Sequence, residues 1–269
     1  MKKIKLSRSS RVLVSAAIDI TCFILCFGAI SWLVARGIEN SGYHWQWYRV
    51  TKYLFIVEEG VFIPGILISG ILITLKIAGI SMIFAFFFGL GTAFLRLSDS
   101  LIGTFIARLY LEVIRNTPLL IQIFFLYFVI SPIIGIGSFA SAVIALSLFE
   151  GAYISEIFRA GIISVHFGQW EAASSLGMSR YETYRYVILP QAVKRVLPPL
   201  TSQAISLIKD SALVSTISIY DLTMRGQEII SETYLTFEIW FIVAGIYLLI
   251  NLTLSLCVNI MERTLKVET

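Results

Sequence analysis

The sequence predicts an all-α integral membrane protein with six transmembrane helices and both termini in the cytoplasm. Hydrophobic residues make up 57% of the 269 residues and charged residues 14%, whereas a soluble domain has about 25% charged residues. The mean hydropathy is +0.84, and several apolar runs are long enough to cross the roughly 30 Å hydrocarbon core of a bilayer. Lys and Arg are also distributed unevenly among the segments that connect these runs, which indicates the orientation.

The first apolar run, residues 12–34, follows eleven residues that carry five positive charges. A secretory signal would have a shorter apolar core and a small-residue cleavage site, so we expect a retained membrane helix. The external segment after it contains aromatic residues over 43–50, which favour an interfacial helix because amphipathic rings collect at the headgroup level. A docking surface for a partner is the alternative. Residues 1–65 are therefore expected to comprise a cytoplasmic tail, the first span and an external loop.

The main membrane domain is expected over residues 66–260, followed by a cytoplasmic tail at 261–269. Its first run is thirty residues long, so this helix must tilt or project from the bilayer. Glycines in it would allow close helix approach. Residues 96–117 have apolar positions at helical spacing, which predicts an amphipathic connector at the membrane surface. The spans of this domain are predicted at about 66–95, 118–134, 138–165, 198–219 and 238–260.

The span at 198–219 is ambiguous because Lys209 and Asp210 interrupt it. The 166–197 loop and the C-terminal tail both carry Lys and Arg, so the positive-inside rule places both in the cytoplasm. An even number of spans must separate them, and only one other is present. With 198–219 as a span, fifteen Lys and Arg residues are cytoplasmic and four are external. This asymmetry supports the assignment.

Charged residues inside predicted spans are candidates for function, because burying a charge in lipid is costly. Lys76 interrupts an apolar helix and is the sharpest candidate for contact with an acidic substrate or an α-carboxylate. Glu150, Lys209 and Asp210 are the other candidates for the substrate pathway. Lys209 and Asp210 are neighbours in sequence and do not face each other on a helix, so each needs a different partner. A structural role in helix packing or gating is the alternative for this pair.

Two further charged residues, Glu156 and Arg159, are three positions apart on one helix face. At this spacing the two side chains are neighbours and could form an ion pair.

The 166–197 loop has the sequence of an ordered helical hairpin. The stretch QWEAASSL favours a short helix, and Gly177 can end it by adopting a positive φ. Ser179 is suited to cap a second helix, with Glu182 completing a capping box. Pro190 is expected at the end or at a bend of that helix. Such a compact knob could insert into a groove on a cytoplasmic partner, and a solvated loop is the alternative.

The same stretch resembles the EAA motif of the membrane subunits of bacterial ABC importers. That motif reads Glu-Ala-Ala, three residues, Gly, nine residues, Ile, one residue, Leu-Pro. This chain matches it at Glu171, Ala172, Ala173, Gly177, Leu189 and Pro190, and Val187 stands where the motif most often has Ile. Segments 115–128, 151–162 and 206–222 also resemble the polar amino acid branch, the histidine, glutamine, arginine and glutamate permeases. The resemblance covers roughly residues 66–260.

The resemblance implies a type I ABC importer permease fold in the bacterial cytoplasmic (inner) membrane. It implies a second permease subunit, identical or similar, and ABC ATPase subunits that bind the EAA loop as a coupling element. An extracytoplasmic binding protein would deliver an amino acid, which alternating access would carry inward. ATP would be bound by the ATPase, so no cofactor is expected in this chain. Besides these proteins, the expected partner is the lipid bilayer, with no nucleic acid.

The sequence limits the other functions that the chain could have. It contains no G-x-x-x-x-G-K-[ST] phosphate loop, so it cannot itself be the ATPase. A membrane enzyme or assembly factor would need a catalytic constellation, and the sequence has no nucleophile elbow, metal-ligand spacing or close carboxylate pair. We therefore expect no enzymatic activity and no metal site. An ion-gradient-driven secondary transporter would combine midplane charges with internal repeats; the charges are present, but no repeat is visible.

Overall fold

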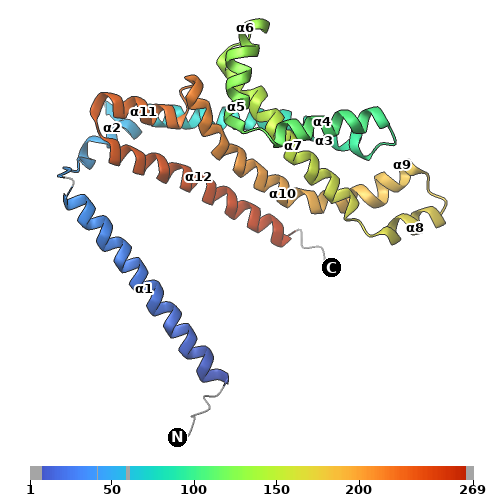
Figure 1. Ribbon diagram of the computed structural model, residues 1–269, viewed down its shortest axis with the longest axis horizontal. Helices are drawn as coiled ribbons and strands as arrows, with labels where there is room; N and C mark the ends of the chain where they lie inside the picture. Colours follow the sequence, from blue (N-terminus) through green and yellow to red (C-terminus); the bar gives the residue numbers. More distant parts are fainter. Residues whose placement is uncertain (1–7, 41, 59–60, 265–269) are drawn as a thin grey trace. The chain divides into compact units, whose positions relative to one another are not determined.

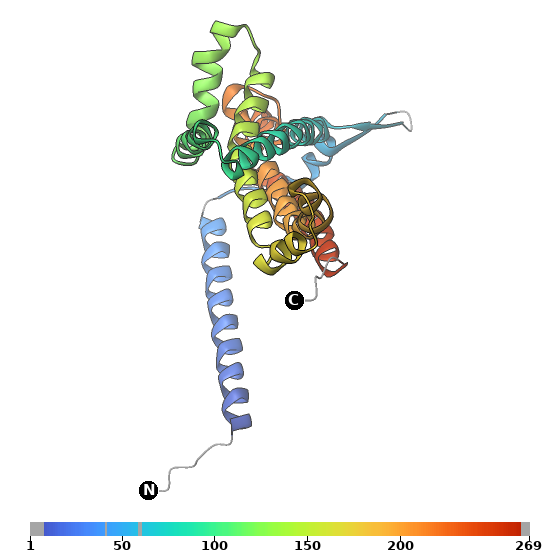
Figure 2. The same ribbon diagram turned by 90° about the vertical axis from the view of Figure 1, so that its right-hand side faces the viewer.

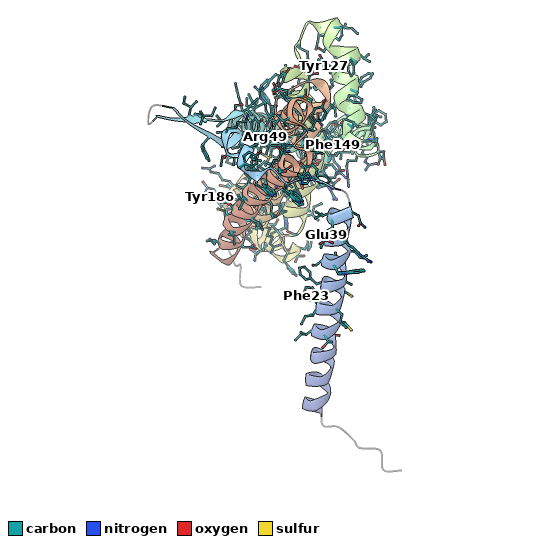
Figure 3. The ribbon with its side chains drawn as sticks, turned by 90° about the vertical axis from the view of Figure 1, so that its left-hand side faces the viewer. Phe23, Glu39, Arg49, Tyr127, Phe149 and Tyr186 are labelled. Carbon is teal, nitrogen blue, oxygen red and sulfur yellow. The ribbon has the colours of Figure 1, made fainter. Side chains whose placement is uncertain are left out.

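The computed structural model describes residues 8–40, 42–58 and 61–264, and it divides into two compact units, Met1–Gln46 and Trp47–Thr269. The first unit contains one long helix, α1 (Arg8–Asn40). The side chains along it, among them Phe23 and Glu39, project outward (Figure 3). Residues 19–40 of this helix are long and apolar enough to cross a membrane. This agrees with the predicted first span.

The second unit begins with short elements before its long helices. A 3₁₀ turn at Trp47–Arg49 and the helix α2 (Thr51–Leu54) precede a hairpin of β1 (Phe55–Glu58) and β2 (Val61–Pro64). The strands pair antiparallel, and the hairpin extends away from the helices of this unit (Figure 2). The interfacial helix predicted over 43–50 is therefore reduced to one turn, and the hairpin was not predicted.

The remainder of this unit is helical (Figure 1). Two further segments, Phe125–Ile130 and Thr183–Ile188, have the wider π-helical turn, and Ser211–Ile217 is a 3₁₀ helix. The α-helices are α3 (Ile66–Leu97), α4 (Leu101–Arg115), α5 (Leu119–Phe124), α6 (Ser131–Ile134), α7 (Ser138–Ile163), α8 (Phe167–Ser175), α9 (Arg180–Glu182), α10 (Leu189–Asp210), α11 (Leu222–Thr233) and α12 (Thr236–Thr264).

Helices α3 and α7 pack tightly through small residues. A Cβ atom placed on Gly89 of α3 would lie 3.0 Å from the carbonyl oxygen of Gly151 on α7. The Ser147 hydroxyl of α7 donates to the carbonyl oxygen of Ser81 on α3 at 3.2 Å. Close approach and cross-helix hydrogen bonds are the main stabilising contacts between helices in lipid. Two other glycines of α3, Gly79 and Gly91, have open space around them, so the predicted close approach does not involve them.

The predicted span at 118–134 is one half of a bent pair of helices. α4 and the 119–134 segment meet at an angle of 105°. Pro118 lies at the bend, where its ring disfavours helical backbone in the preceding residue. Neither half alone is long enough to cross a membrane, but the two halves together have the length and apolar composition of one span.

The predicted span at 198–219 corresponds to the second half of α10 and the 3₁₀ helix after it. Among the described residues, four helices are long and apolar enough to cross a membrane, or five if the bent pair is one span. α10 is not one of them because its charged residues and internal prolines lower its hydropathy. The count of six spans and the cytoplasmic termini therefore stay predictions.

A buried cap joins α11 to the helices beside it. The Asp221 carboxylate accepts a hydrogen bond from the Met224 amide at 2.8 Å, and Asp221 is fully buried. The Leu222 amide donates to the Thr74 hydroxyl of α3 at 3.1 Å, and the Tyr247 hydroxyl of α12 lies 3.4 Å from Asp221. Burial raises the pKa of the Asp221 carboxyl to about 6.

Candidate functional site

The loop that follows α7 folds into a compact helical hairpin, here called the knob (residues 166–190). α8 and α9 lie together at the end of the unit where α7 ends and α10 begins (Figure 1). α8 begins at a cap formed by His166, whose Nδ1 atom accepts a hydrogen bond from the Gly168 amide at 3.0 Å. The sequence prediction of helix, glycine turn and helix is confirmed.

The turn of the knob is a Schellman motif, which explains the spacing of alanine and glycine. Gly177 has a φ of +73°, a left-handed conformation that glycine adopts without penalty. Its amide donates to the carbonyl oxygen of Ser174 at 3.0 Å, and the Met178 amide donates to that of Ala173 at 3.1 Å. These two bonds satisfy carbonyl groups that the helix end would leave unpaired.

The capping box predicted for the second half of the knob is present. The Glu182 amide donates to the Ser179 hydroxyl oxygen at 3.3 Å, and the Glu182 carboxylate accepts from the Ser179 amide at 2.8 Å. The Ser179 hydroxyl also donates to this carboxylate at 2.7 Å. These hydrogen bonds lower the pKa of the Glu182 carboxyl. The helix start is thereby fixed directly after the glycine turn.

A small apolar core holds the knob against the ends of α7 and α10. Ile162 of α7 and Val165, two residues beyond its end, pack with Ile188 and Ala192, and all four are buried. Ala173 is 2% exposed, which leaves no room for a larger side chain at this motif position. The Trp170 and Tyr184 rings meet edge to face with centroids 5.1 Å apart. The knob is therefore an ordered element and not a solvated loop.

The outer surface of the knob is apolar and exposed. Glu171 and Ala172 are both exposed. Four large apolar or aromatic side chains lie on the same hairpin with 66–81% of their surface exposed: Phe167, Leu176, Tyr181 and Tyr186. Exposed apolar groups that gather on one element mark an interaction site. The arrangement can therefore bind a partner, while the buried core beneath it keeps its shape.

The second half of the knob continues directly into α10. Sequence analysis placed the end or a bend of this helix at Pro190, but the helical run continues from Arg180 to Ile217. A proline ring clashes with the carbonyl group four residues earlier in a regular α-helix. The π-helical turn at Thr183–Ile188 lies directly before it and changes this spacing. Leu189 and Pro190 both remain exposed.

Three of the four predicted intramembrane charges lie on α7 and α10. Glu150 is fully buried, and its carboxylate accepts a hydrogen bond from the Gln203 side-chain amide. The Asp210 carboxyl lies beside it and interacts with it. The second carboxylate oxygen of Glu150 has no hydrogen-bond donor among the described residues. Because carboxylate oxygens only accept hydrogen bonds, two neighbouring carboxyl groups that lack a donor would be satisfied by a shared proton or by a cationic group.

Neither Lys76 nor Lys209 forms an ion pair with this carboxyl pair among the residues that the structure describes. Lys209 is exposed, and no ion pair joins it to a residue that the structure describes. Lys76 is also exposed, with its Nζ atom 5.4 Å from the ring centroid of Phe139. Phe139 and Glu150 are separated by roughly 16 Å along α7, at about 1.5 Å per residue. The structure therefore does not bring Lys76 to the carboxyl pair.

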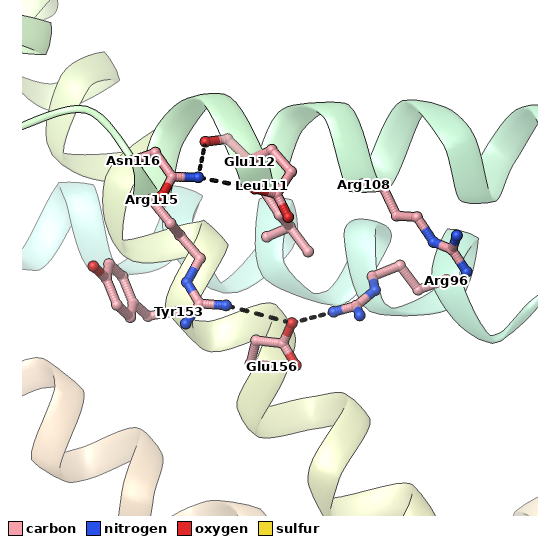
Figure 4. Close-up of a pocket in the computed structure, with 8 residues that line it drawn as sticks. All are labelled: Arg96, Arg108, Leu111, Glu112, Arg115, Asn116, Tyr153 and Glu156. Carbon is pink, nitrogen blue, oxygen red and sulfur yellow. Dashed lines mark hydrogen bonds and ion pairs between the residues drawn. The ribbon is translucent and has the colours of Figure 1, made fainter.

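Glu156 is the centre of an ion-pair network that sequence analysis found only in part. The predicted pair with Arg159 is present at 3.0 Å. Arg96 of α3 also pairs with this carboxylate, and Arg115 of α4 lies 3.7 Å from it (Figure 4). These partners are about 60 and 40 positions away in the sequence, so helical spacing could not reveal them.

Comparison with known proteins decides the family. Residues 85–267 match the model of a family described as binding-protein-dependent transport system inner membrane component. The chain belongs to this family. The relatives are transport permeases of the inner membrane, so the chain is a permease component and not an enzyme. The resemblance drawn from the EAA motif and its flanking segments is confirmed.

Individual relatives cover most of the chain. The glutamine transport system permease protein GlnP of Escherichia coli K12 is 41% identical over 75% of this chain and 94% of its own length. The L-cystine transport system permease protein TcyB of Bacillus subtilis is 41% identical over 74% and 86%. A crystal structure of an amino acid ABC transporter has a TM-score of 0.70 at 40% identity, covering 74% of this chain and 94% of that chain. An inward-facing MetNI methionine ABC transporter, at 18% identity and a TM-score of 0.64, shares the fold.

Proposed function

We propose that this permease component carries a polar amino acid inward across the cytoplasmic membrane by alternating access, driven by ATP. The observation that supports it best is the knob, which has an ordered core, an exposed apolar surface and a direct helical connection to α10. The relatives named for glutamine and L-cystine support a polar amino acid as substrate. The expected partners are cytoplasmic ABC ATPases, a second permease subunit and an extracytoplasmic binding protein. ATP is bound by the ATPase, and this chain needs no cofactor.

The ATPase would bind the knob through Glu171, Ala172 and the exposed apolar side chains around them. Gly177 shapes the turn, Ala173 fits the core, and Leu189 and Pro190 begin the helix that leaves the knob. ATP-driven closure of the ATPases would displace the two knobs of a permease dimer. Because the helical run from Arg180 continues to Ile217, such a displacement would also move Asp210 relative to Glu150 on α7. This connection gives the nucleotide a mechanical route to the substrate pathway.

The substrate pathway would use the charges inside the membrane domain. The carboxyl pair of Glu150 and Asp210, together with Gln203, offers acceptors for the ammonium group of an amino acid. Lys76 offers a cation for its carboxylate, and Lys209 is a further exposed cation. Lys76 lies beside Phe139, roughly 16 Å from Glu150 along α7, so Lys76 and the carboxyl pair would contact the substrate at different points of its passage.

Co-purification from mildly solubilised host membranes tests the coupling. We expect an ATPase with a phosphate loop to co-purify with the wild type and to be lost from Glu171→Arg. Glu232→Arg is the matched control, because Glu232 is also an exposed carboxylate but lies on α11. Uptake of labelled amino acids into vesicles that contain the complex then tests the substrate class. Uptake that persists without the ATPase and collapses with the ion gradient would contradict the proposal and favour a secondary transporter.

A further inference from the structure

A cavity of about 350 Å³ lies between α3, α4 and α7 and is lined mainly by charged side chains (Figure 4). We call it the arginine cavity. It is neither part of the knob nor part of the carboxyl pair. Its lining residues are Arg96, Arg108, Leu111, Glu112, Arg115, Asn116, Tyr153 and Glu156.

Positive charge exceeds negative charge in the arginine cavity. Arg96 and Arg115 share one carboxylate, that of Glu156, which also pairs with Arg159. Glu112 accepts a hydrogen bond from the Asn116 amide at 2.9 Å. Among the residues that the structure describes, none forms an ion pair or hydrogen bond with the Arg108 guanidinium. Its donors face the same cavity as those of Arg96 (Figure 4).

Three guanidinium groups in one concave space repel one another, and the two carboxylates that line it, Glu112 and Glu156, offset only part of this repulsion. A bound anion would offset the rest. The guanidinium group presents a planar set of donors that matches the oxygens of a phosphate better than a point charge does. The cavity also has room for such a group, because its volume is several times the roughly 30 Å³ that one water occupies in the liquid.

The surroundings of the cavity indicate where the phosphate comes from. α4 exposes an apolar face beside its charged flank, with 53–89% of each side chain exposed: Leu101, Ile102, Phe105, Ile106, Leu109 and Val113. A helix with this pattern lies with its apolar face in the acyl region and its cationic side chains at the headgroups. Arg96 is in the last turn of α3, on the end predicted to be cytoplasmic. In the predicted orientation, this end of α3 reaches the phosphates of the inner leaflet.

We infer that the arginine cavity binds a phosphate group, supplied by an anionic phospholipid of the inner leaflet. Arg108 and Arg115 hold the phosphate oxygens, and the lipid's acyl chains lie against the apolar face of α4. Arg96 keeps Glu156 in place beside them. The inference rests on the predicted orientation of the chain and not on the proposed transport function.

Native mass spectrometry of the purified full-length chain, stripped of lipid in mild detergent, tests this inference. Phosphatidylglycerol is titrated against phosphatidylcholine for the wild type, Arg108→Gln and Lys194→Gln. We expect phosphatidylglycerol to bind the wild type several-fold more tightly than phosphatidylcholine. Arg108→Gln should weaken this binding about tenfold, the loss expected for charge-assisted hydrogen bonds to a phosphate. Lys194→Gln removes an exposed cation from α10 and should leave the affinity unchanged.

Thermal unfolding with inorganic phosphate separates the two sources of the anion. Stabilisation of the wild type but not of Arg108→Gln by phosphate, without a preference for phosphatidylglycerol, would assign the cavity to a soluble phosphate. Equal binding of both lipids together with no effect of phosphate would overturn the inference. An equal loss in Arg108→Gln and Lys194→Gln would overturn it too, because the cavity would then have no special role. Arg108 is exposed, so its variant is expected to fold, and its melting temperature without ligand checks this.

Discussion

Substituting Gly177 with alanine tests whether the shape of the knob determines ATPase binding. Gly177 has a φ of +73°, and a Cβ atom added there would meet no heavy atom within 4 Å. The cost of Gly177→Ala is therefore conformational and not steric. An L-residue in the left-handed region costs about 1–2 kcal/mol. This cost lowers the population of the turn conformation in which the amides of Gly177 and Met178 form the two Schellman hydrogen bonds.

This cost predicts the size of the effect on binding. At 25 °C, about 1–2 kcal/mol corresponds to a factor of about 5 to 30 in an equilibrium constant. If the ATPase binds only the ordered knob, its affinity for permease in nanodiscs should fall by up to this factor, because the loss in affinity equals the drop in the population of the ordered knob. Gly177→Asn should lose less, because asparagine tolerates the left-handed region better than alanine. ATPase activity stimulated by the loaded binding protein should fall in the same order.

Gly135→Ala is the matched control for this measurement. Gly135 ends α6 with a φ of +71° and also has open space around it, so its substitution has the same local cost. It lies outside the knob, and we expect unchanged affinity for the ATPase. Wild-type affinity in Gly177→Ala, or an equal loss in Gly135→Ala, would refute the reasoning.

Three further predictions concern packing, pH and transport. A Cβ atom on Gly161 of α7 would lie 2.2 Å from a methyl carbon of Val196 on α10, so Gly161→Ala should lower the free energy of unfolding by about 1–3 kcal/mol. Adding Val196→Ala should restore part of this free energy. Gly245→Ala is the control, because Gly245 has open space around it and its substitution should not destabilise the protein. Burial raises the pKa of Asp221 to about 6, so the folded state binds more protons than the unfolded state between about pH 4 and 6, and stability should fall as pH rises through this window. Unfolding experiments at several pH values should show a change of about 3 kcal/mol across this window. Asp221→Asn keeps the helix cap and should remove this pH dependence. If the variant has the same pH dependence as the wild type, another group is responsible. Lys76→Ala should weaken uptake while the complex still assembles, and Lys76→Arg should restore uptake; unchanged transport in Lys76→Ala would exclude Lys76 from the substrate pathway.

Local sequence predicted most of the knob but little of what the knob contacts. The capping box of Ser179 and Glu182 and the left-handed Gly177 follow from residues within one turn of one another, and both are confirmed. The core beneath the knob joins Ile162 to Ile188, which are 26 positions apart. The contact of Glu150 with Gln203 spans 53 positions. Helical periodicity shows which face of a helix is apolar but not which helix covers it.

Two differences between the predicted and the observed structure concern Pro190 and the hairpin at 55–64. Pro190 was expected to end or bend the second helix of the knob, but a π-helical turn before it lets the run continue. The hairpin at 55–64 was missed because its aromatic neighbours at 43–50 favoured an interfacial helix. Its signal was present, since two apolar stretches, FIV and VFI, flank an EEG sequence that suits a turn.

The unbroken helical run from Arg180 to Ile217 fixes an angle as well as a distance. Each residue turns a helix by about 100°, so a single insertion between the knob and Asp210 would rotate one relative to the other by more than a quarter of a turn. The knob would then present a different side to its partner even though every side chain in it was unchanged. The number of residues between Gly177 and Asp210 therefore determines how the knob is oriented relative to Asp210. Variants that lengthen this run by one residue or by a full turn would separate the effect of rotation from that of length.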